Sequence, residues 1–221
     1  MLEAFGTALP VAVALALSPF PIIAVLLVLL SPEGRAAGLA FLAGRVLGVA
    51  AVMGVAAALS DMLARSEEAS PVVALLRLLV GVVLVVLAVR KWRGRPRSQQ
   101  DASLPGWMTA LAAASPARAG GVALLLSVAN PKELLLGIAV GITLGAAGLP
   151  LGPTLVVVLC CTVVACASVA APVIAFAAAP ERVRGALEGA RAQLVRHNDA
   201  IISVVLLVIG TALIGGGLSG L

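Results

Sequence analysis

The sequence predicts an all-α polytopic membrane protein with six transmembrane helices, arranged as two inverted three-helix repeats whose first and fourth helices are broken. Of its 221 residues, 62% are hydrophobic and only 11% are charged, whereas about 25% are charged in typical soluble domains. The mean hydropathy is +1.16, and apolar stretches longer than the ~18 residues that mark a bilayer helix recur along the chain. Composition therefore disfavours a water-soluble enzyme.

Six apolar stretches define the spans, and each has roughly the length that the hydrocarbon core of a bilayer requires. In chain order, the predicted spans are 5–30, 35–60, 72–89, 118–143, 153–179 and 200–217.

Turn and charge signals separate these spans. SPEGR and GAAGLPLGP carry the Pro and Gly of tight turns, DMLARSEEASP is a polar loop, and RKWRGRPRSQQDASLPG is a long basic linker. A charged segment over 181–199 precedes the sixth span. The chain therefore divides into a first three-helix repeat over 1–91, a basic cytoplasmic linker with an interfacial segment over 92–117, and a second three-helix repeat over 118–221.

Two shorter segments predict helices at the membrane surface. Within 181–196, apolar residues recur at three- and four-residue spacing with charges between them, which is typical of an amphipathic helix on the inner surface. The segment LPGWMTALAAASP, 104–116, predicts a short interfacial helix ahead of the fourth span.

The orientation of the spans follows from their flanking cations, because cytoplasmic loops hold the excess of Lys and Arg. The second and fourth loops together hold only Arg65. The first, third and fifth loops hold Arg35, Arg90, Lys91, Arg93, Arg95, Arg97, Arg182, Arg184, Arg191 and Arg196. This asymmetry predicts a multi-pass protein of the bacterial cytoplasmic membrane with both termini outside. It accounts for the net charge of +5 without nucleic acid as a partner.

Matched proline breaks interrupt the first and fourth spans. ALSPFPII carries Ser18, Pro19 and Pro21, and VANPKELLLG carries Asn130 and Pro131. Proline removes a backbone donor and clashes with the carbonyl one turn back, so each break leaves unpaired backbone groups at mid-membrane. Breaks at corresponding positions of two halves are typical of a transport site. A packing kink is the alternative for either break taken alone.

Four ionisable residues fall inside the predicted spans, and each needs a partner or a wet lining because burial of a charge costs ~3 kcal/mol on insertion scales. They are Arg45, Arg77, Lys132 and Glu133. Glu133 points about 100° away from Lys132 around the helix, so these neighbours are not expected to pair. We expect Arg45 to pair with Glu133, and Lys132 to face the interior and meet a substrate anion. Arg77 lies near an outer end of its span and is either an interfacial anchor or a pathway residue.

The sequence offers no set of catalytic or metal-binding residues, so we expect neither an enzyme nor a cofactor. It has no P-loop, helical His-Glu zinc motif, Ser-His-Asp arrangement or dinucleotide fingerprint. Cys160, Cys161 and Cys166 have no CxxC spacing and no matching Cys in the second span. They predict buried small side chains and disfavour a thiol-disulfide electron carrier. Small residues such as Gly44 and Gly48 predict close helix packing, either within the chain or in a homodimer.

Five stretches resemble a known family: ALSPFPIIAVLLVLLSP, GLAFLAGRVLG, LAVRKWRGRPR, NPKELLLGIAVG and LLVIGTALIGGG. They resemble the glycopeptidolipid-addressing protein family, which includes the sulfolipid-addressing proteins and belongs to the lysine-exporter superfamily of small membrane transporters. The resemblance implies a six-span transporter of two inverted repeats, associated with export of cell-envelope lipids. Arg45 and Glu133 depart from the family pattern, which more often has an aromatic residue and an Asn there, and together they look like a compensating pair. The family motif positions carried here are Ser18, Pro19, Pro21, Asn130, Pro131 and Lys132.

These observations predict a secondary transporter, an exporter or flippase, for a cell-envelope lipid or another small amphipathic or anionic molecule. Lys132 and the amides of the broken helices would meet a phosphate or sulfate, and rocking of the two repeats would give alternating access. Glu133, the one mid-membrane carboxylate, is the first candidate for proton coupling. Two alternatives stay open: an amino-acid or small-solute exporter of the lysine-exporter type, and a non-transporting membrane partner of a lipid-export machine.

Overall fold

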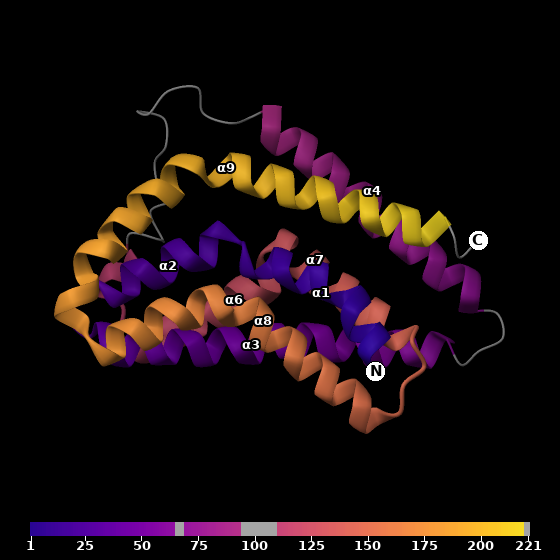
Figure 1. Cartoon of the computed structure of the whole chain (residues 1–221), viewed down its shortest axis with the longest axis horizontal. Coiled ribbons are helices and arrows are strands. Elements are labelled where there is room, and N and C mark those ends of the chain that lie inside the picture. The colour runs from indigo at the N-terminus through magenta and orange to yellow at the C-terminus, as the bar shows by residue number, and fades with distance from the viewer. Residues whose placement is uncertain (65–68, 94–109, 219–221) are drawn as a thin grey trace.

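The computed structural model describes residues 1–64, 69–93 and 110–218 (Figure 1). Within these ranges every regular element is a helix, so the all-α prediction is confirmed. The elements are α1 (Leu2–Ala16), α2 (Pro19–Leu29), α3 (Gly34–Ala64), α4 (Ala69–Arg93), the 3₁₀ turn η2 (Ala110–Ala113), α6 (Pro116–Ala129), α7 (Pro131–Gly145), α8 (Leu151–Ala178) and α9 (Pro180–Leu218).

The proline breaks predicted in the first and fourth spans are present. α1 ends at Ala16 and α2 begins at Pro19, with a bend of 49° between the two helices. α6 ends at Ala129 and α7 begins at Pro131, with a bend of 67°. Proline starts each second helix because it lacks an N–H and pushes the preceding residue out of the helical region.

Two described segments, Gly34–Ser60 and Leu151–Ala178, are long and apolar enough to cross a membrane. Each bent pair adds one more if it is taken as a single span, so length and composition support between two and four spans. The predicted third and sixth spans do not meet this criterion within the described residues. The apolar part of α9, Ser203–Leu218, is shorter than the criterion requires.

The last helix differs from the prediction of a surface helix followed by a separate span. α9 instead runs without interruption from Pro180 to Leu218. The charges in this segment interrupt the apolar run but leave backbone hydrogen bonding intact, and no further proline follows Pro180. Figure 1 shows α9 curving over the molecule until its second half lies beside α4.

The predicted interfacial segment, 104–116, is only partly covered by the structure. Residues 104–109 lie outside the described residues, and the rest of the segment contains η2 and the start of α6.

Helices from the first half of the chain pack mainly against helices from the second half. α3 lies along α6 and α7, and α8 lies along α1 and against α2 (Figure 1). The second helix of each half therefore contacts the broken pair of the other half. α4 lies along α9, and it touches α3 and α7 over only a short stretch.

The crossing of α3 and α6 depends on glycine. A Cβ atom at Gly44 would overlap the carbonyl oxygen of Gly120, and a Cβ atom at Gly120 would lie 3.0 Å from the carbonyl oxygen of Ala40. The two backbones therefore meet directly, as small residues allow in membrane helix pairs. The predicted role of Gly44 in close helix packing is confirmed, and the packing is internal to the chain.

Buried apolar side chains form two separate cores. The first, here the α1 core, joins α1, the second half of α3, α7, the first part of α8 and parts of α4 and α9. The second, here the α2 core, joins α2, the first half of α3, α6, the second part of α8 and Leu187 of α9. The boundary falls between Leu15 and Ile23, between Phe41 and Val49, and between Cys166 and Val169. Both helix breaks lie at this boundary.

Candidate functional site

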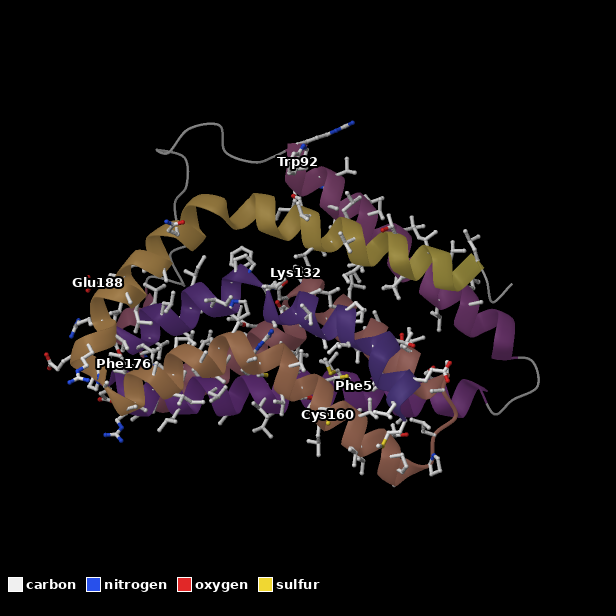
Figure 2. The ribbon with its side chains drawn as sticks, in the orientation of Figure 1. Phe5, Trp92, Lys132, Cys160, Phe176 and Glu188 are labelled. Atoms are coloured by element: carbon white, nitrogen blue, oxygen red, sulfur yellow. The ribbon has the colours of Figure 1, made fainter. Side chains whose placement is uncertain are left out.

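Buried polar side chains gather where the two cores meet. Ser18, Arg45, Ser127, Lys132 and Glu133 are all buried, and we refer to these five residues as the polar layer. Figure 2 shows Lys132 near the middle of the molecule's long axis. Because α3, α8 and both broken pairs pass from one core to the other at this level, the layer is the place where the apolar interior is interrupted.

Asn130 forms the second break and begins α7. Its backbone is extended, with φ −77° and ψ 114°, and its side-chain oxygen Oδ1 accepts a hydrogen bond from the backbone N–H of Lys132 at 3.2 Å. Pro131 follows at the first helical position, where the missing N–H leaves no bond unmade. Local chemistry thus fixes where α7 starts and presents Lys132 and Glu133 in its first turn.

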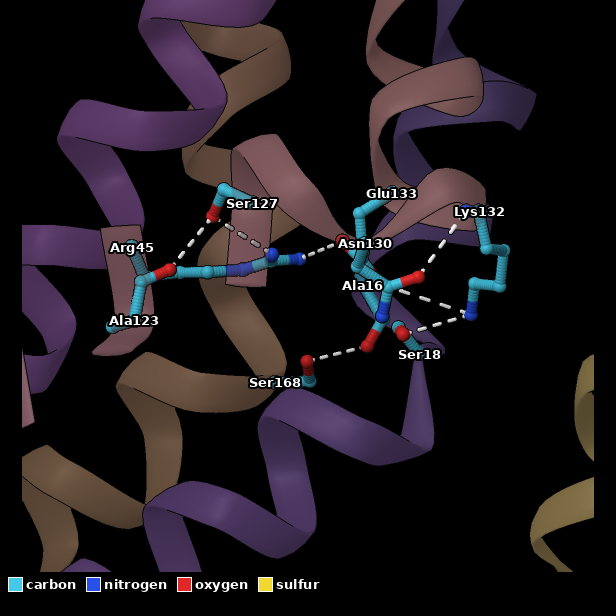
Figure 3. A network of polar contacts seen from close by, with 9 residues as sticks. All are labelled: Ala16, Ser18, Arg45, Ala123, Ser127, Asn130, Lys132, Glu133 and Ser168. Atoms are coloured by element: carbon cyan, nitrogen blue, oxygen red, sulfur yellow. Dashed lines mark hydrogen bonds and ion pairs between the residues drawn. The ribbon is translucent and has the colours of Figure 1, made fainter. Parts of the chain in front are cut away.

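Ser18 forms the first break with nearly the same backbone geometry, φ −71° and ψ 115°. Pro19 and Pro21 are buried in the first turn of α2. The Ser18 hydroxyl does not cap its own helix, and it accepts a hydrogen bond from Lys132 Nζ at 2.7 Å. The two breaks are therefore alike in backbone and joined by a side chain (Figure 3).

Arg45 reaches the second break from α3. Its Nη2 donates to Glu133 Oε2 at 2.6 Å, and its Nη1 donates to the Ser127 hydroxyl at 3.1 Å (Figure 3). Only 1% of the Arg45 side chain and 1% of the Glu133 side chain are exposed, so the pair is fully desolvated. The predicted ion pair between Arg45 and Glu133 is confirmed.

The expectation that Lys132 and Glu133 do not pair is wrong. Lys132 Nζ lies 3.8 Å from Glu133 Oε1, within ion-pair distance. The two Cβ atoms do point about 100° apart on the helix, but both side chains are long and curl into the same buried space. Lys132 therefore has Ser18 and Glu133 as partners.

Two serines contribute to this region beyond the predicted set. Ser127 accepts from Arg45 and donates to the carbonyl of Ala123 at 3.1 Å. Ser168 of α8 donates to the carbonyl of Ala16, which the first break leaves without its helical partner. Ser127 lies one turn before Asn130, and that position was the only sequence signal for it. Ser168 is one of several small polar residues that the sequence places in membrane helices, where such residues join neighbouring helices.

Two buried atoms of the polar layer have no hydrogen-bond partner among the described residues, Arg45 Nε and Glu133 Oε1. Buried polar atoms of side chains normally have at least one hydrogen-bond partner. Both atoms belong to the central ion pair, so the layer holds hydrogen-bonding capacity that this arrangement does not use.

The remaining candidates lie elsewhere. Arg77 belongs to α4, and its side chain is outside the described part of the structure. Cys161 and Cys166 are buried as predicted, whereas Cys160 is exposed, because it falls on the outward face of α8. The described residues contain no group of His, Cys, Asp or Glu that could hold a metal ion.

Comparison with known proteins gives a family match over most of the chain. The family model of Sap, the sulfolipid-1-addressing protein, matches residues 8–219 of the chain. No curated protein and no solved structure matches it. The matched range includes both helix breaks and every residue of the polar layer, and it confirms the resemblance to the sulfolipid-addressing proteins. The chain therefore belongs to the family of the sulfolipid-1-addressing protein Sap.

Proposed function

We propose that the chain is a secondary transporter that carries a cell-envelope lipid, or another anionic amphipathic molecule, across the bacterial cytoplasmic membrane. The chain is a membrane protein of a family associated with lipid addressing. The observation that carries the proposal is the buried hydrogen bond from Lys132, in one helix break, to Ser18, in the other. Two broken helices that meet at the centre of a bundle are typical of a transport site.

Three features support an arrangement of six spans as two inverted repeats. The helices exchange partners between the halves, and the two breaks share their backbone angles. The second helix of each half also sends a polar side chain to the break of the other half, Arg45 from α3 and Ser168 from α8. With the cytoplasmic cations placed as the sequence predicts, both termini would lie outside.

The charge balance of the polar layer explains why an anion would bind. Arg45 and Glu133 compensate each other, and Lys132 leaves the layer with one uncompensated positive charge. A phosphate or sulfate oxygen could replace Ser18 as the acceptor of the Lys132 ammonium. That replacement would release the bond between the two breaks, where helical hydrogen bonding is already interrupted. The repeats could then rock about this level, which is how alternating access arises in such folds.

Replacement of Lys132 by glutamine is expected to slow transbilayer movement of an anionic lipid by at least about tenfold, the factor that corresponds to ~1.4 kcal/mol. The variant loses the ammonium that would meet the headgroup. The measurement uses protein reconstituted into vesicles that contain fluorescent phosphatidylglycerol, and it follows the loss of fluorescence when dithionite is added outside. Radiolabelled lysine and glutamate, tested in the same vesicles, distinguish an amino-acid exporter.

Arg118→Gln is the matched control, because it removes an exposed cation from α6, and it should keep the wild-type rate. Equal rates for Lys132→Gln and the wild type would contradict a transport role for the polar layer.

Glu133→Gln is expected to remove the dependence of lipid movement on a proton gradient. Glu133 is the only buried carboxylate in the described part of the chain, and it touches both cations of the layer. The same vesicles, prepared with different internal and external pH, give the measurement. Glu188→Gln removes an exposed carboxylate and is the control. A Glu133→Gln variant with an unchanged pH dependence would exclude this residue as the coupling site.

A second candidate is a non-transporting partner of a lipid-export machine. Arg182 and Arg184 at the start of α9 are exposed, and they could dock an acidic partner. A docking protein would tolerate Lys132→Gln and lose function when Arg182 and Arg184 are both replaced by glutamate. The two variants therefore separate the candidates.

A further inference from the structure

A large apolar groove lies beside the second helix break. It has a volume of about 610 Å³ and is bounded by α3, α4, α7 and the end of α6. Its lining residues are Ala51, Val52, Val55, Ala56, Leu59, Ser60, Leu76, Val80, Val128, Leu134, Ile138 and Ile142. The only polar side chain among them, Ser60, donates its hydroxyl proton to the carbonyl of Ile142. The groove therefore offers almost nothing to a polar ligand, since burial of an unpaired polar group is costly.

The groove has the length of one membrane leaflet. Along α3 it extends from Ala51 to Ser60, and at ~1.5 Å per residue this is about 14 Å, close to half of the ~30 Å hydrocarbon core. At its inner end, Val128 and Leu134 stand on either side of the break that holds Lys132 and Glu133. In the proposed arrangement of spans, one end would thus lie at mid-membrane beside the polar layer, and the other would lie near one membrane surface.

The groove is open at its side. Val55, Leu59 and Val128 are 60%, 57% and 42% exposed, whereas Ala56 and Val80 form a buried floor. The opening exists because α4 packs mainly on α9 and touches α3 and α7 only briefly. A chain could therefore enter or leave laterally, without passing through water.

The length and the lining of the groove favour one kind of occupant. An extended hydrocarbon chain matches the groove in length and in polarity, and it needs no hydrogen-bond partner there. The inner end of the groove adjoins the polar layer, which carries a net positive charge that could hold an anionic headgroup. A lipid whose headgroup lies at the polar layer would therefore place its chain in the groove.

We propose that this groove holds one hydrocarbon chain of the carried lipid, in the leaflet on the Ser60 side, with the chain end next to the polar layer. The inference rests on the proposed function and deepens it. It implies that the substrate has at least one alkyl chain about as long as a membrane leaflet. It also implies that this chain travels laterally between α3, α4 and α7 while the headgroup passes Lys132.

Ala51→Trp tests the proposal, because Ala51 is an exposed lining residue and an indole there would fill the groove. Ala43→Trp is the matched control. It makes the same change at an exposed position of α3, in the half of the helix that contributes to the α2 core. The probe is phosphatidylglycerol with a diazirine in its acyl chain, in vesicles of phosphatidylglycerol and phosphatidylethanolamine. Illumination followed by peptide mass spectrometry locates the adducts.

We expect adducts on Val52, Val55 and Ile138 to exceed those on Leu159 and Val163 by about fivefold, a preference of about 1 kcal/mol. The last two residues are exposed apolar positions of α8 outside the groove. Ala51→Trp should remove the excess and Ala43→Trp should keep it. Equal labelling of the groove and of α8, or an excess that survives Ala51→Trp, would overturn the proposal. An absence of lipid adducts from the groove, as a second copy seated there would produce, would overturn it as well.

Lipid movement gives a second readout, separate from the labelling. Ala51→Trp should slow the transbilayer movement of fluorescent phosphatidylglycerol by about tenfold, and Ala43→Trp should leave its rate unchanged. A block by Lys132→Gln together with an unaffected Ala51→Trp would reject the groove and leave the proposed function standing. Groove labelling with a Lys132→Gln variant of wild-type rate would instead reject the transport role of the polar layer.

Discussion

Replacement of Glu133 by leucine is expected to destabilise the folded protein by about 3 to 5 kcal/mol, the usual result of removing one partner of a buried ion pair. Arg45 would keep its charge inside the bundle after losing the carboxylate at 2.6 Å, with Ser127 as its remaining hydrogen-bond partner. Lys132 would lose a neighbouring negative charge at the same time. Unfolding of the purified protein in mixed micelles with increasing SDS, followed by far-UV circular dichroism, measures the loss.

The double variant Arg45→Met with Glu133→Leu should recover most of that stability. An apolar replacement of both partners is often close to neutral, because no unpaired charge stays buried. The charge swap, Arg45→Glu with Glu133→Arg, should also regain part of the loss caused by either single change. Glu188→Leu, at an exposed position, is the control and should change little. A coupling free energy near zero in the double-mutant cycle would contradict the direct pair.

Gly44→Val is expected to destabilise the protein by about 3 kcal/mol, the upper end of the usual range for overpacking. The new side chain would meet the backbone carbonyl of Gly120, which cannot move aside as a flexible side chain can. α3 and α6 would have to separate, and Arg45, the next residue on α3, would be drawn away from Ser127 and Glu133. The same SDS titration gives the stability, and the lipid assay gives the rate.

Gly54→Val is the control for this variant. It adds the same side chain to the same helix, at a glycine whose Cβ would meet nothing within 4 Å. It carries only the effects of helix propensity and should stay within about 1 kcal/mol of the wild type. If both variants were equally stable, the direct backbone contact between α3 and α6 would be disproved.

The features that could be predicted from the sequence have one of two causes. Either neighbouring residues determine them directly, or the alternative would cost too much free energy in an apolar interior. Composition is enough to predict the class, because 11% of the residues are charged, against about 25% in typical soluble domains. Pro19 and Pro131 each determine a helix start through their own ring and missing N–H. The Arg45–Glu133 pair was predictable because a lone charge in this interior is too costly to leave without a partner.

The features that escaped prediction depend on side-chain direction and on which helices meet. Ser127 and Ser168 look like many other hydroxyls in membrane helices, and nothing local shows that one faces Arg45 and the other the carbonyl of Ala16. Lys132 and Glu133 begin in different directions from the helix, but both side chains are long and have several rotatable bonds. The ammonium and the carboxylate can therefore come together. The charges within α9 looked like a boundary between two segments, yet a helix backbone tolerates them.

The separation of the α1 core from the α2 core gives the molecule two units that can each stay rigid. Phe20 and Leu42 are the partly buried apolar residues, among those described, that pack against both. A close-packed core resists deformation, so strain imposed on one unit concentrates in the thin region between them. Charged side chains can exchange partners in that region without any core being repacked. In the proposed transport cycle the polar layer would be the pivot between the two units, and the same five side chains that would select a ligand would also set how easily the pivot turns.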